Sequence, residues 1–177
     1  GNGSLRFDGV DDYVNTGTFA SLGSDTTKTI SAWVNPSGSA TGFIFAVPRT
    51  FGATAGFGFL VENGKWGARY WTSTSAALSS TVDATAGQWA LVTLVQSGTT
   101  ASLYVNGVSV ATANNAGAFD SSLRATYIGA LNNNNVPSYP FSGKVDDVRI
   151  YDRDLSAGEI AEIYTAGNVI VTNSQTD

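Results

Sequence analysis

Carboxylates are the side chains of this sequence best suited to chemistry, and they gather in two places. Near the start lie Asp8, Asp11 and Asp12, and near the end lie the adjacent Asp146 and Asp147. Neighbouring residues of a strand point to opposite faces, and Asp146 shares its parity with the apolar Val148 and Ile150. The pattern predicts that Asp146 points toward the core, where a carboxylate must be paired, hydrogen-bonded or metal-bound.

Calcium is a suitable partner for such carboxylates, because it takes carboxylate and carbonyl oxygens in a flexible geometry. The first and last strands of an antiparallel sandwich are commonly neighbours, which would bring the two acidic groups together. We therefore expect a calcium ion held by Asp8 or Asp11 together with Asp146 and backbone carbonyls. Since the chain has no cysteine, such an ion would act as a structural staple.

An alternative explanation of the same carboxylates needs no metal. Asp8 and Asp12 would cap turns. Arg6 and Arg149 would neutralise nearby acidic residues across neighbouring strands. Both explanations stay open at the level of the sequence.

A polar loop at residues 131–143, "LNNNNVPSYPFSG", has the composition of a sugar-binding surface. Its candidate ligand residues are Asn132, Asn133, Asn134, Asn135 and Tyr139. Amides hydrogen-bond hydroxyl groups, and an aromatic ring packs on the face of a pyranose. The alternative is a solvated loop in which asparagines form turns.

The segment "KWGARYW" adds aromatic candidates. By strand alternation Trp66 and Tyr70 share one face, and Arg69 and Trp71 share the other. Because arginine is rarely buried without a partner, we expect Arg69 and Trp71 on the surface, as part of the ligand site. Trp33 alternates away from its apolar neighbours and is expected on the second side of its sheet. Packing within the sheets is the alternative role for all the tryptophans.

Composition points to a turn-rich β protein and against several functions. The 177 residues include 20 glycines, with 42% hydrophobic and only 13% charged residues, which favours one globular domain rich in strands. A net charge of −5 without a basic patch argues against nucleic acid. No apolar run approaches the roughly 20 residues of a membrane span.

Catalysis is not expected either. Histidine and cysteine are absent, which removes imidazole and thiolate chemistry. Glycoside hydrolysis needs two carboxylates that flank one bond, whereas Asp146 and Asp147 are adjacent and point to opposite faces. We therefore predict that the chain is not an enzyme.

Turn and helix signals complete the expected architecture. Asn63-Gly64 and Asn106-Gly107 predict two tight hairpins, and about a dozen short strands favour an antiparallel sandwich or barrel. The sequence 156–159, "SAGE", fits a capping box that begins a helix, and Gly167 is a plausible end.

Several segments together resemble one family. They are "LRFDGVDDYVNTG", "TISAWVNP", "GQWALVTLVQSGTTASLYVNGVSV", "YIGA" and "FSGKVDDVRIYDRDLSAGEIAEIY". In this order they resemble the laminin-G-like domains of the concanavalin A-like jelly-roll superfamily, over roughly residues 4–166. The resemblance implies an all-β antiparallel sandwich with one short C-terminal helix, with Trp89 in the core. We expect a jelly-roll domain over residues 1–167 and a tail or linker over residues 168–177.

The same resemblance implies a range of functions. Members of the family bind carbohydrate as accessory modules of secreted enzymes, many hold calcium, and others belong to bacterial adhesins. We expect a non-catalytic carbohydrate-binding module of a larger protein, exported to the cell surface or beyond and joined to other domains. The alternative is a structural or protein-interaction module of an adhesin or surface protein, because a fold alone does not fix a function.

Overall fold

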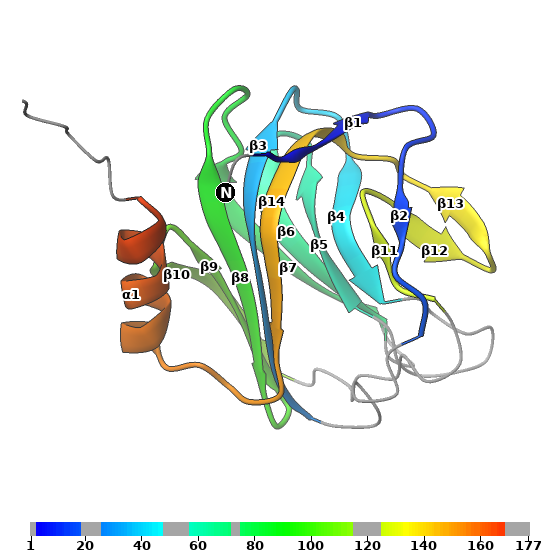
Figure 1. The fold of residues 1–177 in the computed structure, drawn as a ribbon. Helices are drawn as coiled ribbons and strands as arrows, with labels where there is room; N and C mark the ends of the chain where they lie inside the picture. Colours follow the sequence, from blue (N-terminus) through cyan, green and yellow to red (C-terminus); the bar gives the residue numbers. More distant parts are fainter. Residues whose placement is uncertain (1–2, 19–25, 48–56, 72–74, 115–124, 169–177) are drawn as a thin grey trace, which may run out of the picture.

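The computed structural model describes residues 3–18, 26–47, 57–71, 75–114 and 125–168. Two six-stranded antiparallel sheets face one another, and a helix lies against the outside of one of them (Figure 1). In spatial order, sheet A contains β1 (Leu5–Asp8), β14 (Ser142–Tyr151), β3 (Thr27–Pro36), β8 (Ala90–Ser97), β9 (Thr100–Val105) and β10 (Val108–Asn114). The predicted antiparallel sandwich is confirmed.

Sheet B has the same number of strands. In spatial order it contains β2 (Val14–Asn15), β11 (Tyr127–Ile128), β4 (Gly42–Val47), β5 (Phe57–Glu62), β6 (Lys65–Trp71) and β7 (Ser75–Asp83). A small separate hairpin joins β12 (Leu131–Asn133) to β13 (Val136–Ser138). The first and last strands of the chain pair with each other, as expected, since β1 lies beside β14.

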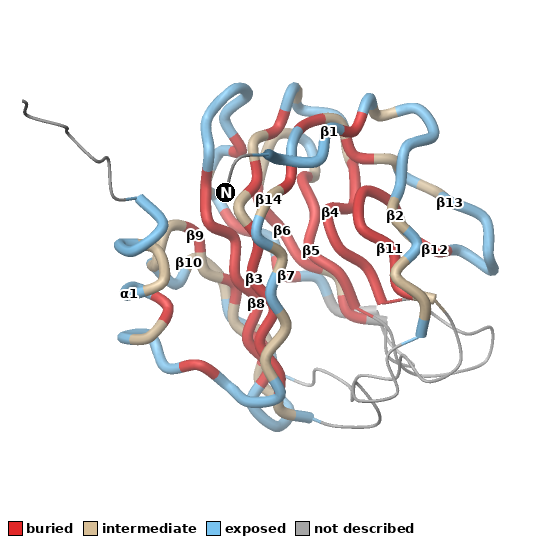
Figure 2. Tube along the Cα trace, in the orientation of Figure 1, coloured by how far each residue is buried: buried red, intermediate tan, exposed pale blue. Residues whose placement is uncertain are grey.

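Alternating side chains of both sheets fill the core between them. Ile30 and Val34 of β3 and Trp66 and Tyr70 of β6 all belong to this buried cluster, which confirms the predicted inward face of β6. Figure 2 shows the buried strands inside a shell of exposed turns. Each large apolar side chain buried in this way stabilises the fold by about 1.5–3 kcal/mol.

Both predicted Asn-Gly hairpin turns are present. Asn63 and Gly64 have φ values of 50° and 74°, and Asn106 and Gly107 have φ values of 52° and 82°. Positive φ at both central residues is the requirement of a type I′ turn. The turn residues therefore set the register of β5 with β6 and of β9 with β10.

The single described helix, α1 (Ala157–Gly167), begins and ends where the sequence predicts. The hydroxyl of Ser156 accepts the N–H of Glu159 at 3.3 Å, and the carboxylate of Glu159 accepts the N–H of Ser156 at 2.8 Å. Ile160 is buried in an apolar cluster with Leu155 and Val95. This cluster fixes α1 to the outer face of sheet A.

Candidate functional site

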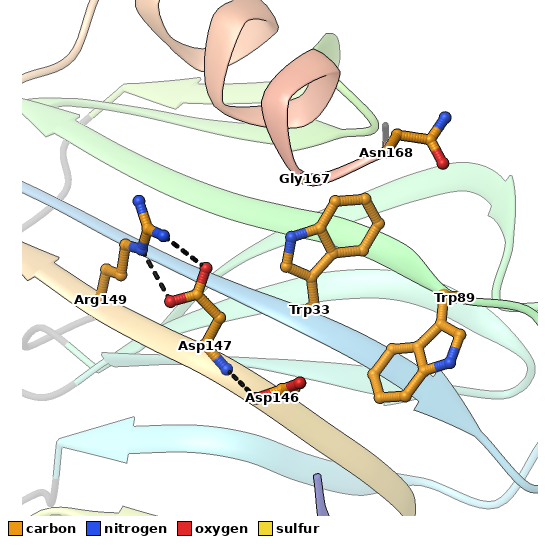
Figure 3. A pocket seen from close by; sticks show the side chains of 7 residues that line it. All are labelled: Trp33, Trp89, Asp146, Asp147, Arg149, Gly167 and Asn168. Carbon is orange, nitrogen blue, oxygen red and sulfur yellow. Dashed lines mark hydrogen bonds and ion pairs between the residues drawn. The ribbon is translucent and has the colours of Figure 1, made fainter. Parts of the chain in front are cut away.

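A groove of about 490 Å³ lies on the outer face of sheet A, beside the C-terminal end of α1 (Figure 3). We call it the tryptophan groove. Its lining residues are Trp33, Trp89, Asp146, Asp147, Arg149, Gly167 and Asn168. Two indoles, two carboxylates, a guanidinium and an amide therefore surround one open recess, which is the constellation expected of a polar ligand site.

A β-bulge in β14 places the carboxylates in this groove. Asp146 pairs with Trp33 of β3, but the next partners are Arg149 and Ser31. Three steps along β14 thus match two steps along β3, and the extra residue reverses the alternation. Val145 faces the core and is 1% exposed, whereas Asp146 lies on the outer face. The prediction that Asp146 points into the core is wrong, because it assumed an uninterrupted strand.

Asp147 occupies the bulge in a left-handed conformation, with φ of 49°. Its carboxylate accepts Nε of Arg149 at 2.8 Å and pairs with Nη2 at 2.7 Å. This hydrogen bond raises the pKa of Arg149 above its ordinary value. Arg149 thus neutralises Asp147, as the metal-free explanation expected, although the two residues lie on one strand and not across strands.

Asp146 keeps its charge uncompensated. One carboxylate oxygen accepts the N–H of Asp147 at 2.8 Å, but within the described ranges no lysine or arginine forms a salt bridge with it. This carboxylate lines the groove together with the indoles of Trp33 and Trp89 (Figure 3). A ligand in the groove would therefore meet a free acceptor.

The two tryptophans of the groove have different surroundings. Trp33 stacks on Tyr164 of α1, with ring centroids 5.9 Å apart, and faces away from the core as predicted. Trp89 precedes β8 and is 42% exposed. The expectation of a core position for Trp89 is wrong, because the residue lies in the turn before the strand begins at Ala90. An exposed indole is a surface on which a sugar ring or a cation can pack.

A second groove of about 460 Å³ adjoins the first along α1 and shares Asp147, Arg149 and Gly167 with it. Its other charged lining residues are Arg153, Glu159 and Glu162. Arg153 and Glu159 form an ion pair, which together with the capping bonds lowers the pKa of Glu159 to about 2. The two grooves give a continuous polar surface beside the helix.

The N-terminal carboxylates form a separate cluster. Asp8, Asp11 and Asp12 each offer an oxygen within 4.8 Å of the others. Asp8 accepts the N–H of Val10 at 2.7 Å, and Asp12 accepts the N–H of Asp8 at 3.0 Å, so both also cap the turn. The structure thus brings together Asp8 and Asp11, which the sequence proposes as calcium ligands, and adds Asp12 to the same cluster.

Asp146 does not join this cluster. Asp8 pairs with Ser142 in the register of β1 with β14, and Asp146 lies four residues further along the same strand. At about 3.3 Å per residue, the separation along β14 is about 13 Å. A single ion cannot span it, so the expected grouping of Asp146 with Asp8 or Asp11 is wrong.

The asparagine run forms the turn between β12 and β13. Asn132 is fully buried, and its amide donates to the carbonyl of Ala125 at 2.7 Å and accepts the N–H of Asn135 at 2.7 Å. Asn134 and Asn135 have φ values of 55° and 65°, which asparagine tolerates better than most residues. Asn132 therefore holds the turn and is closed to a ligand, while Asn133, Asn134 and Asn135 are exposed.

Tyr139 and Arg69 lie on the outer face of sheet B. Tyr139 is 56% exposed and its ring contacts the edge of Phe43, with centroids 6.2 Å apart. The ring of Phe43 covers Gly58, which pairs with Arg69 in β6. Arg69 forms an ion pair with Glu62, and its Nη1 has no hydrogen-bond partner within the described ranges. The side chain of Trp71 lies outside the described part of the structure.

The sequence does not predict the tryptophan groove as a site, although several of its lining residues lie in segments that the sequence analysis singles out. Trp33 and Trp89 lie within two of the family-like segments, and Asp146, Asp147 and Arg149 belong to a third. The pairing of β14 with β3 and β3 with β8 brings these segments together. The outward orientation predicted for Trp33 was the one sequence feature that pointed to this face. No residue pattern in the sequence indicated the bulge that places Asp146 beside Trp33.

Comparisons with known proteins agree with this architecture. Domain 4 of AbnA, an extracellular GH43 arabinanase from Geobacillus stearothermophilus solved with arabinotriose, is 18% identical, with 91% of this chain and 76% of that chain covered and a TM-score of 0.76. The CBM40 of the Ruminococcus gnavus IT-sialidase, bound to α2,3-sialyllactose, is 19% identical, with 92% and 100% covered and a TM-score of 0.69. A heptameric SAP-like pentraxin from Limulus polyphemus is 20% identical, with 91% and 81% covered and a TM-score of 0.68. At these identities the likeness is one of fold.

Two further findings concern the sequence. No curated protein sequence matches the chain significantly. Among the described residues, no helix combines the length and apolarity needed to cross a bilayer. The family model of the concanavalin A-like lectin/glucanases superfamily matches residues 8–161, and the chain belongs to this superfamily.

Proposed function

We propose that this domain is a non-catalytic carbohydrate-binding module of a larger exported protein, and that its ligand lies in the tryptophan groove. The observation that carries the proposal is the exposed indole of Trp89 beside the free carboxylate of Asp146. Sugar rings pack on indole faces through their C–H surfaces, and their hydroxyls need acceptors and donors close by. Asn168 and the carboxylates supply those partners at the edge of the groove.

Binding without catalysis is the chemistry that these groups support. Glycoside hydrolysis needs one carboxylic acid that can protonate the leaving group and a second carboxylate opposite it. Both carboxylate oxygens of Asp147 contact Arg149, so this side chain is not free to act on a substrate. Asp146 would then act alone, and a single carboxylate does not provide both roles. Structural relatives that carry sugars, such as the CBM40 with sialyllactose, agree with a binding role.

The outer face of sheet B is the second candidate surface for the same function. Tyr139 and Arg69 lie there. Asn133, Asn134 and Asn135 are exposed in the turn between β12 and β13, which precedes Tyr139 in the chain. The paired Arg69 and Glu62 and a single exposed ring make a weaker platform than two indoles. Trp71 remains a candidate for this surface by strand alternation.

Calcium is a further part of the proposal. The carboxylates of Asp8, Asp11 and Asp12 are close enough to contact one ion, since calcium takes oxygens at 2.3–2.6 Å, so that opposite ligands lie about 5 Å apart. Bound there, calcium would offset two of the three negative charges in the turn after β1. Its role would be to stabilise that turn and not to contact a sugar in the tryptophan groove.

A glycan array with titration of the best hit tests the proposal and locates the site. We expect Trp89→Ala to weaken binding at least tenfold and to keep the fold, as circular dichroism would show, because the ring is 42% exposed and lies outside the core cluster. The matched variant Tyr139→Ala removes an exposed ring on the outer face of sheet B and should leave the affinity unchanged. Loss of binding in Tyr139→Ala alone would move the ligand to sheet B. An array without any hit would favour a structural or protein-interaction module instead.

A further inference from the structure

We propose that the tryptophan groove selects glycans that carry positively charged amino groups, such as chains of glucosamine, over neutral and carboxylated glycans. The inference rests on the proposed carbohydrate-binding function and specifies the class of sugar. Three independent features of the groove favour positive charge, and they come from β14, from α1 and from the two indoles.

The first feature is the balance of charges that line the groove. Asp147 and Arg149 neutralise each other through two contacts of 2.8 and 2.7 Å. Asp146 remains without a salt bridge among the described residues, and one of its oxygens accepts the N–H of Asp147. The lining therefore carries one negative charge in excess, which attracts an ammonium group and repels the carboxylate of an acidic sugar.

The second feature is the end of α1. Gly167 and Asn168, at the C-terminus of the helix, form part of the groove wall. The C-terminal end of a helix carries about half a negative charge, and the last turn of α1 contains no basic side chain to offset it. The helix thus adds to the negative potential that Asp146 creates.

The third feature is the pair of indoles. The π faces of Trp33 and Trp89 are electron-rich, and an ammonium group near an indole face is attracted to its quadrupole. Trp89 is exposed enough to accept such a group. Asp146 of β14 and Trp89, directly before β8, line the same groove on either side of β3, which carries Trp33 (Figure 3). A carboxylate beside an indole favours a cation more than either group alone.

The adjoining groove repeats this charge pattern. Asp147 and Glu159 are paired with Arg149 and Arg153, which leaves Glu162 as the carboxylate without a salt bridge among the described residues lining it. Asp146 and Glu162 therefore lie in two contiguous recesses. A chain of amino sugars would offer one ammonium group to each.

Two basic side chains lie on the same side of sheet A outside both grooves. Lys144 is two residues from Asp146 on β14, and Arg6 is its partner in β1. Both are exposed and neither lines a groove. Solvent screens their effect on a bound ligand.

The test compares three oligosaccharides of equal length by isothermal titration calorimetry: a glucosamine oligomer, its fully N-acetylated form and an oligogalacturonate. At about pH 6 most amino groups of the glucosamine oligomer carry a proton. We expect the glucosamine oligomer to bind about fivefold more tightly than the acetylated one. The uronate should bind most weakly, and added salt should reduce the preference for the amine.

Charge-removing variants locate the preference. The double variant Asp146→Asn with Glu162→Gln should bring the affinities for the amino and the acetylated oligomer to within twofold, because the loss of charge weakens binding of the amino oligomer more than binding of the acetylated one. Asp83→Asn is the matched control, since this carboxylate lies on β7, pairs with Lys65 and lines neither groove. It changes the net charge in the same direction, and the preference should survive.

The outcomes separate this inference from the function on which it rests. Equal or tighter binding of the neutral or acidic oligomer would overturn the preference for amines and leave carbohydrate binding intact. A preference that persists in the double variant would overturn the role of the groove carboxylates. If none of the three oligomers binds, the inference fails, and the glycan array then decides whether the proposed function fails with it.

Discussion

Gly167 determines how closely α1 approaches sheet A. A Cβ atom at this position would lie 2.7 Å from two atoms of the Trp33 indole, a distance that requires the ring or the helix to move. Gly167→Ala should therefore lower the free energy of unfolding by about 1–3 kcal/mol, even though alanine favours helices by about 1 kcal/mol. Urea denaturation followed by tryptophan fluorescence measures the change.

A second glycine of the same helix provides the control for this prediction. At Gly158 the nearest atom to an added Cβ is the Ser156 hydroxyl oxygen, 3.9 Å away. Gly158→Ala should raise the free energy of unfolding by up to about 1 kcal/mol, as helix propensity predicts. If both variants stabilise the protein, the close packing of Gly167 on Trp33 is not a constraint.

At the scale of elements, the capping box determines where α1 begins. Ser156→Ala removes the hydroxyl that accepts the N–H of Glu159 and should cost about 1 kcal/mol of stability. Circular dichroism during urea denaturation measures this. Gln in place of Glu159 keeps the reach of the side chain but removes the charge that Arg153 contacts, so it separates capping from ion pairing.

The same element has a predictable response to acid. The pKa of Glu159 is lowered from 4.5 to about 2, first by its hydrogen bond with Arg153 and then by those with Ser156. A carboxylate with a depressed folded-state pKa contributes stability above its unfolded pKa and loses it as the pH falls through the folded one. The contribution of Glu159 should thus fade between about pH 4.5 and pH 2. A pH titration of the stability difference between wild type and Glu159→Gln tests this; a constant difference over that interval contradicts it.

The elements also show which features the sequence could reveal. The Asn-Gly turns and the capping box depend on contacts within a few residues, so residue types at fixed spacing predict them. The bulge at Asp147 depends on how β14 meets β3, and nothing within β14 marks it. Asn132 was assigned to the surface because of its type, whereas its burial results from the fold of the turn onto Ala125.

For the whole molecule, the antiparallel sandwich could be predicted from an ordered set of family-like segments. The candidate site could not be predicted in the same way. Trp33, Trp89 and Asp146 come from segments far apart in sequence and meet only through the pairing in sheet A and the position of α1. Register, which decides which side chains share a face, is a property of the assembled sheet.

Calcium binding would act on the whole molecule. A ligand that binds only the folded state at about a hundred times its Kd adds about 2.7 kcal/mol of stability. We expect calcium to raise the melting temperature and EDTA to lower it. Asp11→Asn should abolish this response, because Asp11 contributes an oxygen to the cluster and makes no turn hydrogen bond among the described contacts.

The control for the calcium prediction is Asp152→Asn, an exposed carboxylate outside the cluster. It makes the same change of charge and should leave the calcium response intact. A melting temperature that is identical in calcium and in EDTA would remove the metal from the proposal. The carboxylates of Asp8 and Asp12 would then serve as turn caps alone.

The placement of β1 and of the end of α1 has a practical consequence for how this domain is handled. Leu5 pairs with Val145, directly before Asp146, and Asn168 lines the tryptophan groove itself. An affinity tag, fluorophore or sensor-chip anchor attached at Asn168 or next to Leu5 would therefore lie beside that groove and obstruct it. The β12–β13 hairpin lies on the side of the molecule away from α1 (Figure 1). A cysteine introduced at the exposed Asn133 would give an attachment point from which the groove faces freely into solution.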